Sequence, residues 1–158
     1  MRVADGYTPA AMGTLSEKLL APQARPQVVA DCVKLVDDEV AAKSGLSGIA
    51  IKGAHAIVKA VKGGIIPEVL DSLLPSFAEK LEPTYQGWLA GDGALTDYMN
   101  GRAPEVAEAL LSITDERAQQ TKNATLRKAY EKLRPTGKKN VEQAVPRLAQ
   151  LLAKHAPR

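Results

Sequence analysis

Aromatic residues and cysteine are scarce in this chain. Aromatic side chains make up 4% of the residues, with a single Phe and a single Trp, so the apolar positions are mostly Ala, Val, Leu and Ile. Such side chains suit closely packed helices. The single cysteine, Cys32, excludes a disulfide framework, a CxxC redox pair and a multi-cysteine zinc site within one chain. This usage favours a reducing compartment, and we expect a cytoplasmic protein.

Long apolar runs and strand-like patterns are missing as well. No run approaches the roughly 20 residues that a membrane span requires, and the first residues lack the apolar segment of a secretory signal. No segment alternates apolar and polar residues between hairpin turns. The sequence therefore predicts an all-α fold, a compact single-domain helical bundle of about seven to nine helices over residues 14–158. Residues 1–13 are expected to be a disordered N-terminal segment.

Residues 47–62 carry the clearest helical pattern. At about 100° per residue, one face holds Ala50, Ala54, Ile57, Val58 and Val61, and another holds Lys52, His55, Lys59 and Lys62. We expect Ser47 to cap this helix and Gly63 with Gly64 to end it. The pattern predicts a helix at or near the centre of the fold, with the aliphatic face buried and the lysines in solvent. A membrane-surface role is disfavoured, because such helices carry Trp, Phe or Leu on their apolar face.

Caps and prolines indicate where the other helices begin and end. Thr14 and Glu17 have the spacing of a capping box at the start of the first helix. Another helix is expected to start at Pro67. Pro75 should kink or break it, because proline removes a backbone hydrogen bond and clashes with the preceding turn, and Pro83 should end it.

The second half of the chain leaves one boundary open. Residues 104–134 fit either one long helix or two, with Thr114 and Asp115 as a candidate fresh start, because the stretch that follows is polar all round. Residues 138–155 form the last expected helix, bent if anything at Pro146.

Basic charge is concentrated in the last quarter of the chain. Residues 1–116 hold 10 Lys and Arg against 16 Asp and Glu, whereas residues 117–158 hold 11 against 2. Segregated charge either attracts an anionic partner or lets the basic segment lie against the acidic remainder of its own fold. We favour the second interpretation, because surface charge alone is a weak functional signal.

No arrangement of residues specifies a reaction. His55 and His155 have no metal ligand at a recognisable spacing, and no serine lies in a nucleophile elbow. We therefore expect no metal and no cofactor, and Cys32 is expected in the core. The favoured role is a non-catalytic intracellular interaction or scaffold protein, whose partner is another protein or a second copy of the chain. One alternative is an enzyme with a small aromatic-lined pocket near Trp88.

The other alternative is a nucleic-acid-binding protein. Residues 40–62 have the spacing of a helix-turn-helix, with Gly45 in the turn. Base readout would be poor, since Gly48 and Ile49 take the outward positions early in the second helix. The candidate contacts to nucleic acid or another anion come from this element and from the basic last quarter: Lys43, Ser47, Lys52, Lys59, Lys62, Arg127, Lys128, Lys138 and Lys139.

A family resemblance lies in the run RPQVVADCVKLVDDEVAAKSGLSGIAIKGAHAIVKAVKGG, followed by LLPSF and by NATLRKAYEKLR. With these stretches the chain resembles a small family of uncharacterised bacterial proteins, actinobacterial in the main, that is catalogued as a domain of unknown function. KSGLSG is the most distinctive piece, and the resemblance covers most of the chain from Leu15 onward. It implies a stand-alone intracellular protein and brings no activity, ligand or catalytic residue with it.

Overall fold

Eight α-helices and one short 3-10 helix are found in the part of the chain that the computed structural model describes, residues 14–61 and 64–158 without the side chains of 46 and 47. In chain order they are α1 (Leu15–Leu20), α2 (Arg25–Ala42), α3 (Gly45–Val61), α4 (Ile65–Leu89), α5 (Leu95–Asn100), α6 (Ala103–Gln120), α7 (Ala124–Leu133), the 3-10 helix η1 (Arg134–Thr136) and α8 (Gly137–His155). These residues contain no strand, so the predicted all-α class is confirmed. The expected disordered segment 1–13 lies outside the described residues.

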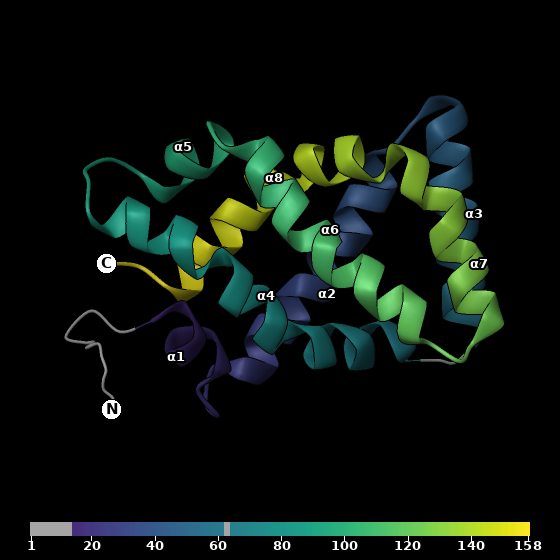
Figure 1. Ribbon diagram of the computed structural model, residues 1–158, viewed down its shortest axis with the longest axis horizontal. Helices are drawn as coiled ribbons and strands as arrows, with labels where there is room; N and C mark the ends of the chain where they lie inside the picture. The colour runs from purple at the N-terminus through teal and green to yellow at the C-terminus, as the bar shows by residue number, and fades with distance from the viewer. Residues whose placement is uncertain (1–13, 62–63) are drawn as a thin grey trace.

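The helices are arranged along one long axis (Figure 1). α1, α5 and the C-terminus lie at one end of the molecule, and α3 packs beside α7 at the other. Between the ends, α4 contacts α2 and α6, and α8 packs against α2, α5 and α6. Segments far apart in sequence are therefore neighbours at both ends.

The end formed by α1, α4, α5 and α8 has a filled core. The rings of Tyr85 and Trp88 are both buried, with their centroids 5.6 Å apart, and Met99 from α5 is buried in the same cluster. The Tyr85 hydroxyl donates to the Ala156 carbonyl at 2.8 Å, and the Arg158 guanidinium lies over the Trp88 ring, 4.5 Å from its centroid. The aromatic pair thus also holds the C-terminus against α4.

The capping box is confirmed, the left-handed glycine expected after the 47–62 helix is found at Gly64, and the predicted cap at Ser47 is wrong. Thr14 Oγ1 accepts from the Glu17 amide at 3.0 Å and Glu17 Oε1 accepts from the Thr14 amide at 3.0 Å, so the capping box is present. Gly64, with φ +83°, supplies the left-handed turn before α4, while Gly63 lies outside the described residues. Ser47 was predicted as an N-cap, but α3 already begins at Gly45.

Of the two outcomes predicted at Pro75, a kink or a break, the structure has no break, and the predicted end at Pro83 is wrong. α4 continues through both residues for 25 residues, and Figure 1 shows that it bends near its middle, as a kink would. Both prolines lie on the exposed side, whereas Leu73, Leu74 and Ala78 are buried on the other. The apolar contacts of that buried face offset the lost backbone hydrogen bonds. α8 likewise continues through Pro146.

Residues 104–134 form two helices. α6 runs on through Thr114 and Asp115, so the candidate start at that point is wrong, and the break comes at residues 121–123. There the Asn123 side chain accepts from the Leu126 amide at 3.1 Å and caps α7. The cap lies at the end of the polar stretch, where periodic apolar residues resume.

The predicted inward face of α3 is wrong in most of its residues. Ala54 is buried, but Ile57 is 43% exposed, Val61 is 37% exposed and Ala50 is exposed. The buried stripe passes instead through Gly48, Ile51 and Ala54, with Val58 half-buried. The helix is apolar on nearly every side, so the spacing of apolar residues could not select the buried face.

The position of α3 also differs from the prediction. It lies at one end of the molecule, against α2, α4 and α7, and not at the centre. His55, which was expected in solvent with the lysines, faces α2, where its Nε2 lies 3.3 Å from Asp37 Oδ1.

The basic last quarter of the chain lies against the acidic helices that precede it. Arg147 of α8 contacts Glu39 of α2 at 2.8 Å, and Lys138 contacts Glu108 of α6 at 3.2 Å. This arrangement agrees with the interpretation that the segregated charges neutralise each other within the fold.

Asp31 of α2 offers a test of how α8 is held. Its Oδ2 lies 2.8 Å from Lys154 Nζ and 2.6 Å from His155 Nε2. These hydrogen bonds, the Lys154 bond foremost, lower the pKa of Asp31 to about 2. Because this pKa is lowered by folding, the carboxylate stabilises the fold above its unfolded pKa of about 4, and that stability is lost as pH falls through about 2.

We expect Asp31→Asn to lower the free energy of unfolding by about 1 kcal/mol at neutral pH, and the difference from the wild type to shrink as pH falls from about 4 to about 2. Urea denaturation followed by circular dichroism measures both. Asp38→Asn is the control, since that exposed carboxylate on the same helix pairs with Lys34 one turn away. Equal losses in the two variants would mean that Asp31 does not hold α8.

Candidate functional site

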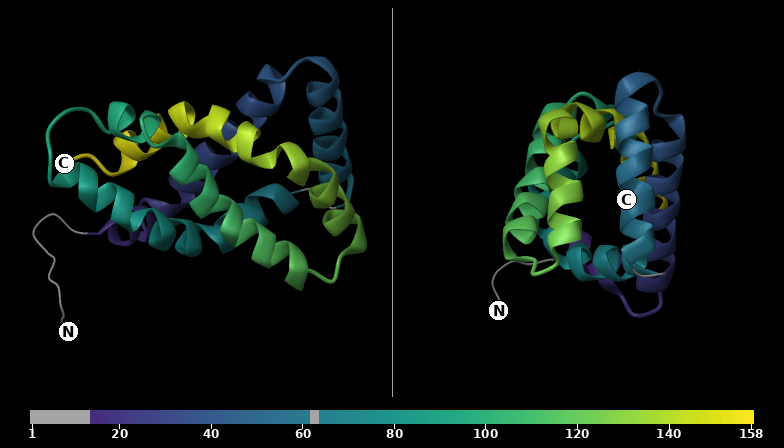
Figure 2. Two further views of the ribbon diagram at one scale, coloured as in Figure 1. Left: turned by 45° about the horizontal axis from the view of Figure 1, so that its top comes forward. Right: turned by 90° about the vertical axis from the view of Figure 1, so that its right-hand side faces the viewer.

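A partly enclosed cavity of about 470 Å³ lies inside the bundle. Every described α-helix except α5 contributes to its walls. The right-hand view of Figure 2 looks along the molecule and shows α3 and α7 at the near end, with α8 above them and α4 below. Its volume is in the range of small-molecule sites, roughly 300–1,000 Å³.

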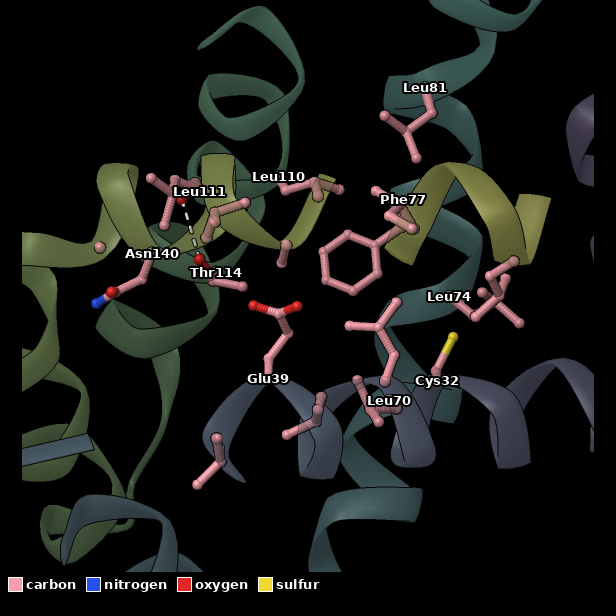
Figure 3. A pocket seen from close by; sticks show the side chains of 18 of the residues that line it. Cys32, Glu39, Leu70, Leu74, Phe77, Leu81, Leu110, Leu111, Thr114 and Asn140 are labelled. Atoms are coloured by element: carbon pink, nitrogen blue, oxygen red, sulfur yellow. Dashed lines mark hydrogen bonds between the residues drawn. The ribbon is translucent and has the colours of Figure 1, made fainter. Parts of the chain in front are cut away.

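The walls are almost entirely aliphatic. α4 contributes Leu70, Leu74 and Phe77, and α6 contributes Leu110, all visible in Figure 3 with their side chains around one space. From α8, Ala144 leaves room that a longer side chain would occupy. The side chains that α4, α6 and α8 direct at this space therefore leave it unfilled.

One side of the cavity carries a charged cluster, Glu39 with Lys43 and Arg147. The Glu39 carboxylate points into the space in Figure 3, although its side chain is only 13% exposed. Its Oε1 lies 3.2 Å from Lys43 Nζ and its Oε2 lies 2.8 Å from Arg147 Nη1. A carboxylate at an apolar wall needs such partners, because an unpaired charge there would be costly. The cluster carries one net positive charge.

A second polar cluster at the cavity wall is built on Tyr130. Its hydroxyl donates to Asp115 and lies 2.7 Å from Thr114 Oγ1. Arg134 donates two hydrogen bonds, of 2.8 and 3.0 Å, to the same carboxylate. The guanidinium of Arg134 lowers the pKa of Asp115, while burial and then Asp115 raise the pKa of Tyr130 to about 12. The tyrosine is therefore a neutral hydroxyl at physiological pH.

The sequence-predicted anion contacts that the structure describes differ in their surroundings. Lys43 is largely buried, and its Nζ is engaged by Glu39 and by Gln143 at 2.8 Å. Lys138 pairs with Glu108, and Arg127 donates to the Thr121 carbonyl. Lys52, Lys59, Lys128 and Lys139 are exposed, and Lys62 together with the Ser47 side chain lies outside the described part of the chain.

The region around Trp88 is filled, not hollow. Trp88 is 5% exposed, and its indole nitrogen donates to the Gly93 carbonyl at 3.1 Å. Tyr85 and Arg158 pack on its ring, as described above. The cavity lies elsewhere, and side chains fill the place beside Trp88 where a pocket was predicted.

A family model described as a family of unknown function, DUF6918, matches residues 15–156. The chain belongs to this family. No curated protein and no solved structure matches the chain. The cavity and its two polar clusters all lie within the residues that match DUF6918.

Two features are absent from the described residues of this DUF6918 chain, a membrane-spanning helix and a cluster of metal ligands. None of its helices combines the length and apolar character that crossing a bilayer requires. Between residues 14 and 158, leaving out the residues not described, no three His, Cys, Asp or Glu side chains gather as metal ligands would.

The cavity was not foreseen from the sequence. Its lining residues are the same aliphatic residues that would fill a core, so no motif marks them. The one available signal is volume: a chain with one Phe and one Trp has few side chains large enough to fill the space between six or more helices. Cys32, predicted in the core, does line this space and is half-buried.

The alkylation rate of Cys32 tests whether its thiol is buried at the cavity wall. Burial, and secondarily the charge of Asp31, raise the pKa of the Cys32 thiol to about 11, so at pH 8 it holds roughly a hundredfold less thiolate than an ordinary cysteine. We expect iodoacetamide to alkylate Cys32 at least tenfold more slowly in the folded protein than in guanidinium, as read by intact mass. Equal rates would contradict the placement of the thiol.

Proposed function

We infer that the protein is a non-catalytic intracellular binding protein whose ligand is an elongated apolar molecule held in the cavity. The observation that carries this proposal is a 470 Å³ space with aliphatic walls in the middle of the bundle. A scaffold role, favoured from the sequence, would leave that space without a use, and so would nucleic-acid binding.

The size of the cavity supports an occupant. Apolar side chains around an unfilled space lose the packing contacts of an ordinary core, so a space of about 470 Å³ carries a cost even though it is partly open to solvent. Water would lower that cost little, because an apolar wall gives each water molecule few partners. An apolar ligand restores the missing contacts.

The polar clusters favour a role in binding a ligand through apolar contacts over a role in catalysis. Glu39 and Asp115 both have basic neighbours, and the hydroxyl of Tyr130, whose pKa is raised further above its ordinary value, is protonated at physiological pH. Burial raises the pKa of the Cys32 thiol as well, which lowers its thiolate fraction further. Such groups can orient the polar end of an amphiphile at the side where Glu39 and Thr114 lie, with the apolar chain directed toward Leu74 and Leu81 (Figure 3).

Titration with N-phenyl-1-naphthylamine, an uncharged probe that fluoresces in apolar surroundings, tests this function. We expect saturable binding and displacement by a long-chain fatty alcohol. Ala144→Leu should weaken probe binding at least tenfold and raise the free energy of unfolding by about 1 kcal/mol, because the larger side chain fills part of the cavity.

Ala30→Leu is the matched control, since Ala30 is exposed on α2 and does not line the cavity. It should leave probe binding unchanged and alter stability by less than about 0.5 kcal/mol. An absence of saturable binding by the wild type, or equal binding by the Ala144→Leu variant, would overturn the proposal.

A further inference from the structure

The outer face of α3 is apolar and lies in solvent. Ile49 is 71% exposed, Ile57 is 43% exposed and Val61 is 37% exposed. With Gly53 these residues are spaced by four, so they form one row along the helix. The small residues beside the row, Ala50, Ala56 and Ala60, are exposed as well. Monomeric proteins rarely leave a contiguous apolar face of this kind in water.

The charged side chains of α3 itself are all basic, and one exposed acid of α2, Asp37, lies 3.3 Å from His55 beside the lysine edge. Lys52 and Lys59 are exposed along one edge of it, and α3 has no acidic residue. α7, which packs beside α3, carries the exposed Lys128 and Lys132 together with one exposed acid, Glu131. Figure 2 shows the two helices side by side at this end of the molecule.

We propose that α3 docks on an anionic membrane surface, with its outer row at the headgroup boundary and its lysines against lipid phosphates. Basic residues near a bilayer are attracted to anionic lipid, and exposed aliphatic side chains gain by leaving water for the acyl boundary. α3 carries both the exposed aliphatic side chains and the lysines that such an interface needs. Because Trp and Phe are absent from the row, the docking is shallow and reversible.

Two other occupants fit the face less well. Nucleic acid is held through phosphate contacts and base edges, which would use Lys52 and Lys59 but leave Ile49 and Ile57 in water. A second copy packed antiparallel would gather the lysines of both copies along one edge of the seam, where like charges repel. The bilayer accounts for the apolar row and the lysines together.

The inference goes beyond ligand binding and does not require an occupied cavity. The inner side of α3 nevertheless contributes Ile51 to the cavity wall, so a docked α3 would lie between the bilayer and the cavity.

Flotation with vesicles tests the docking surface. We expect the protein to float with vesicles of equal parts phosphatidylglycerol and phosphatidylcholine, and to stay unbound with phosphatidylcholine alone or at high ionic strength. Lys52→Gln with Lys59→Gln should weaken partitioning roughly thirtyfold. Ile49→Ser with Ile57→Ser should weaken it roughly tenfold or more. These side chains are exposed, so both variants are expected to stay folded, as circular dichroism checks.

Lys34→Gln with Lys80→Gln is the matched control. It removes two exposed lysines from α2 and α4 and should partition like the wild type. Binding to neutral vesicles as strong as to anionic ones, or binding that the isoleucine pair does not change, would overturn the proposal. So would tighter binding to duplex DNA than to vesicles, or a dimeric mass that the isoleucine pair abolishes in a protein that does not float.

Discussion

The helices of this protein surround a space that their side chains do not fill, and most of the structure depends on that constraint. At one end, Tyr85, Trp88 and Met99 bring enough volume to fill the core. Beyond Leu81 toward α3 and α7, the facing residues are Leu, Val, Ala and one Phe, and the bundle stays hollow. Interiors are normally packed to crystal density, so the hollow region is where a function is expected.

The polar groups at the wall of the hollow region have charged or hydrogen-bonding partners within the protein. Glu39 reaches the apolar wall but is held between Lys43 and Arg147. The Tyr130 hydroxyl at another part of the wall is satisfied by Asp115 and Thr114. Ion pairs such as Asp31 with Lys154 also fix α8 against α2, which keeps the two long walls of the cavity together. Basic residues of the last quarter of the chain thus form ion pairs with acidic residues of the earlier helices.

The sequence predicted the helices better than it predicted their faces. The capping box at Thr14, the turn at Gly64 and the all-helical class follow from local chemistry that a single residue or a short spacing decides. α4 neither breaks at Pro75 nor ends at Pro83, because burial of one side of the helix outweighs a lost hydrogen bond, and only the alternative of a bend at Pro75 agrees with the structure. The prediction of the buried face of α3 was wrong because apolar residues lie on most sides of this helix, so the neighbouring helices decide which side is covered.

The candidate site was harder to predict than the fold, for a related reason. Lys43 was grouped with Lys52 and Lys59 by charge, yet the structure buries the first and exposes the other two. A cavity has no motif, since it arises from the volumes of residues on seven helices. α3 joins both features, because Ile51 lines the cavity on its inner side while Ile49 and Ile57 face outward.

A crystal structure of the protein with a long-chain fatty alcohol tests the central claim most directly. The account predicts continuous density for the alkyl chain beside Leu74 and Phe77, with the hydroxyl near Glu39 or Thr114. Density confined to the protein surface, or a core in which Phe77 and Leu110 meet and close the space, would contradict it.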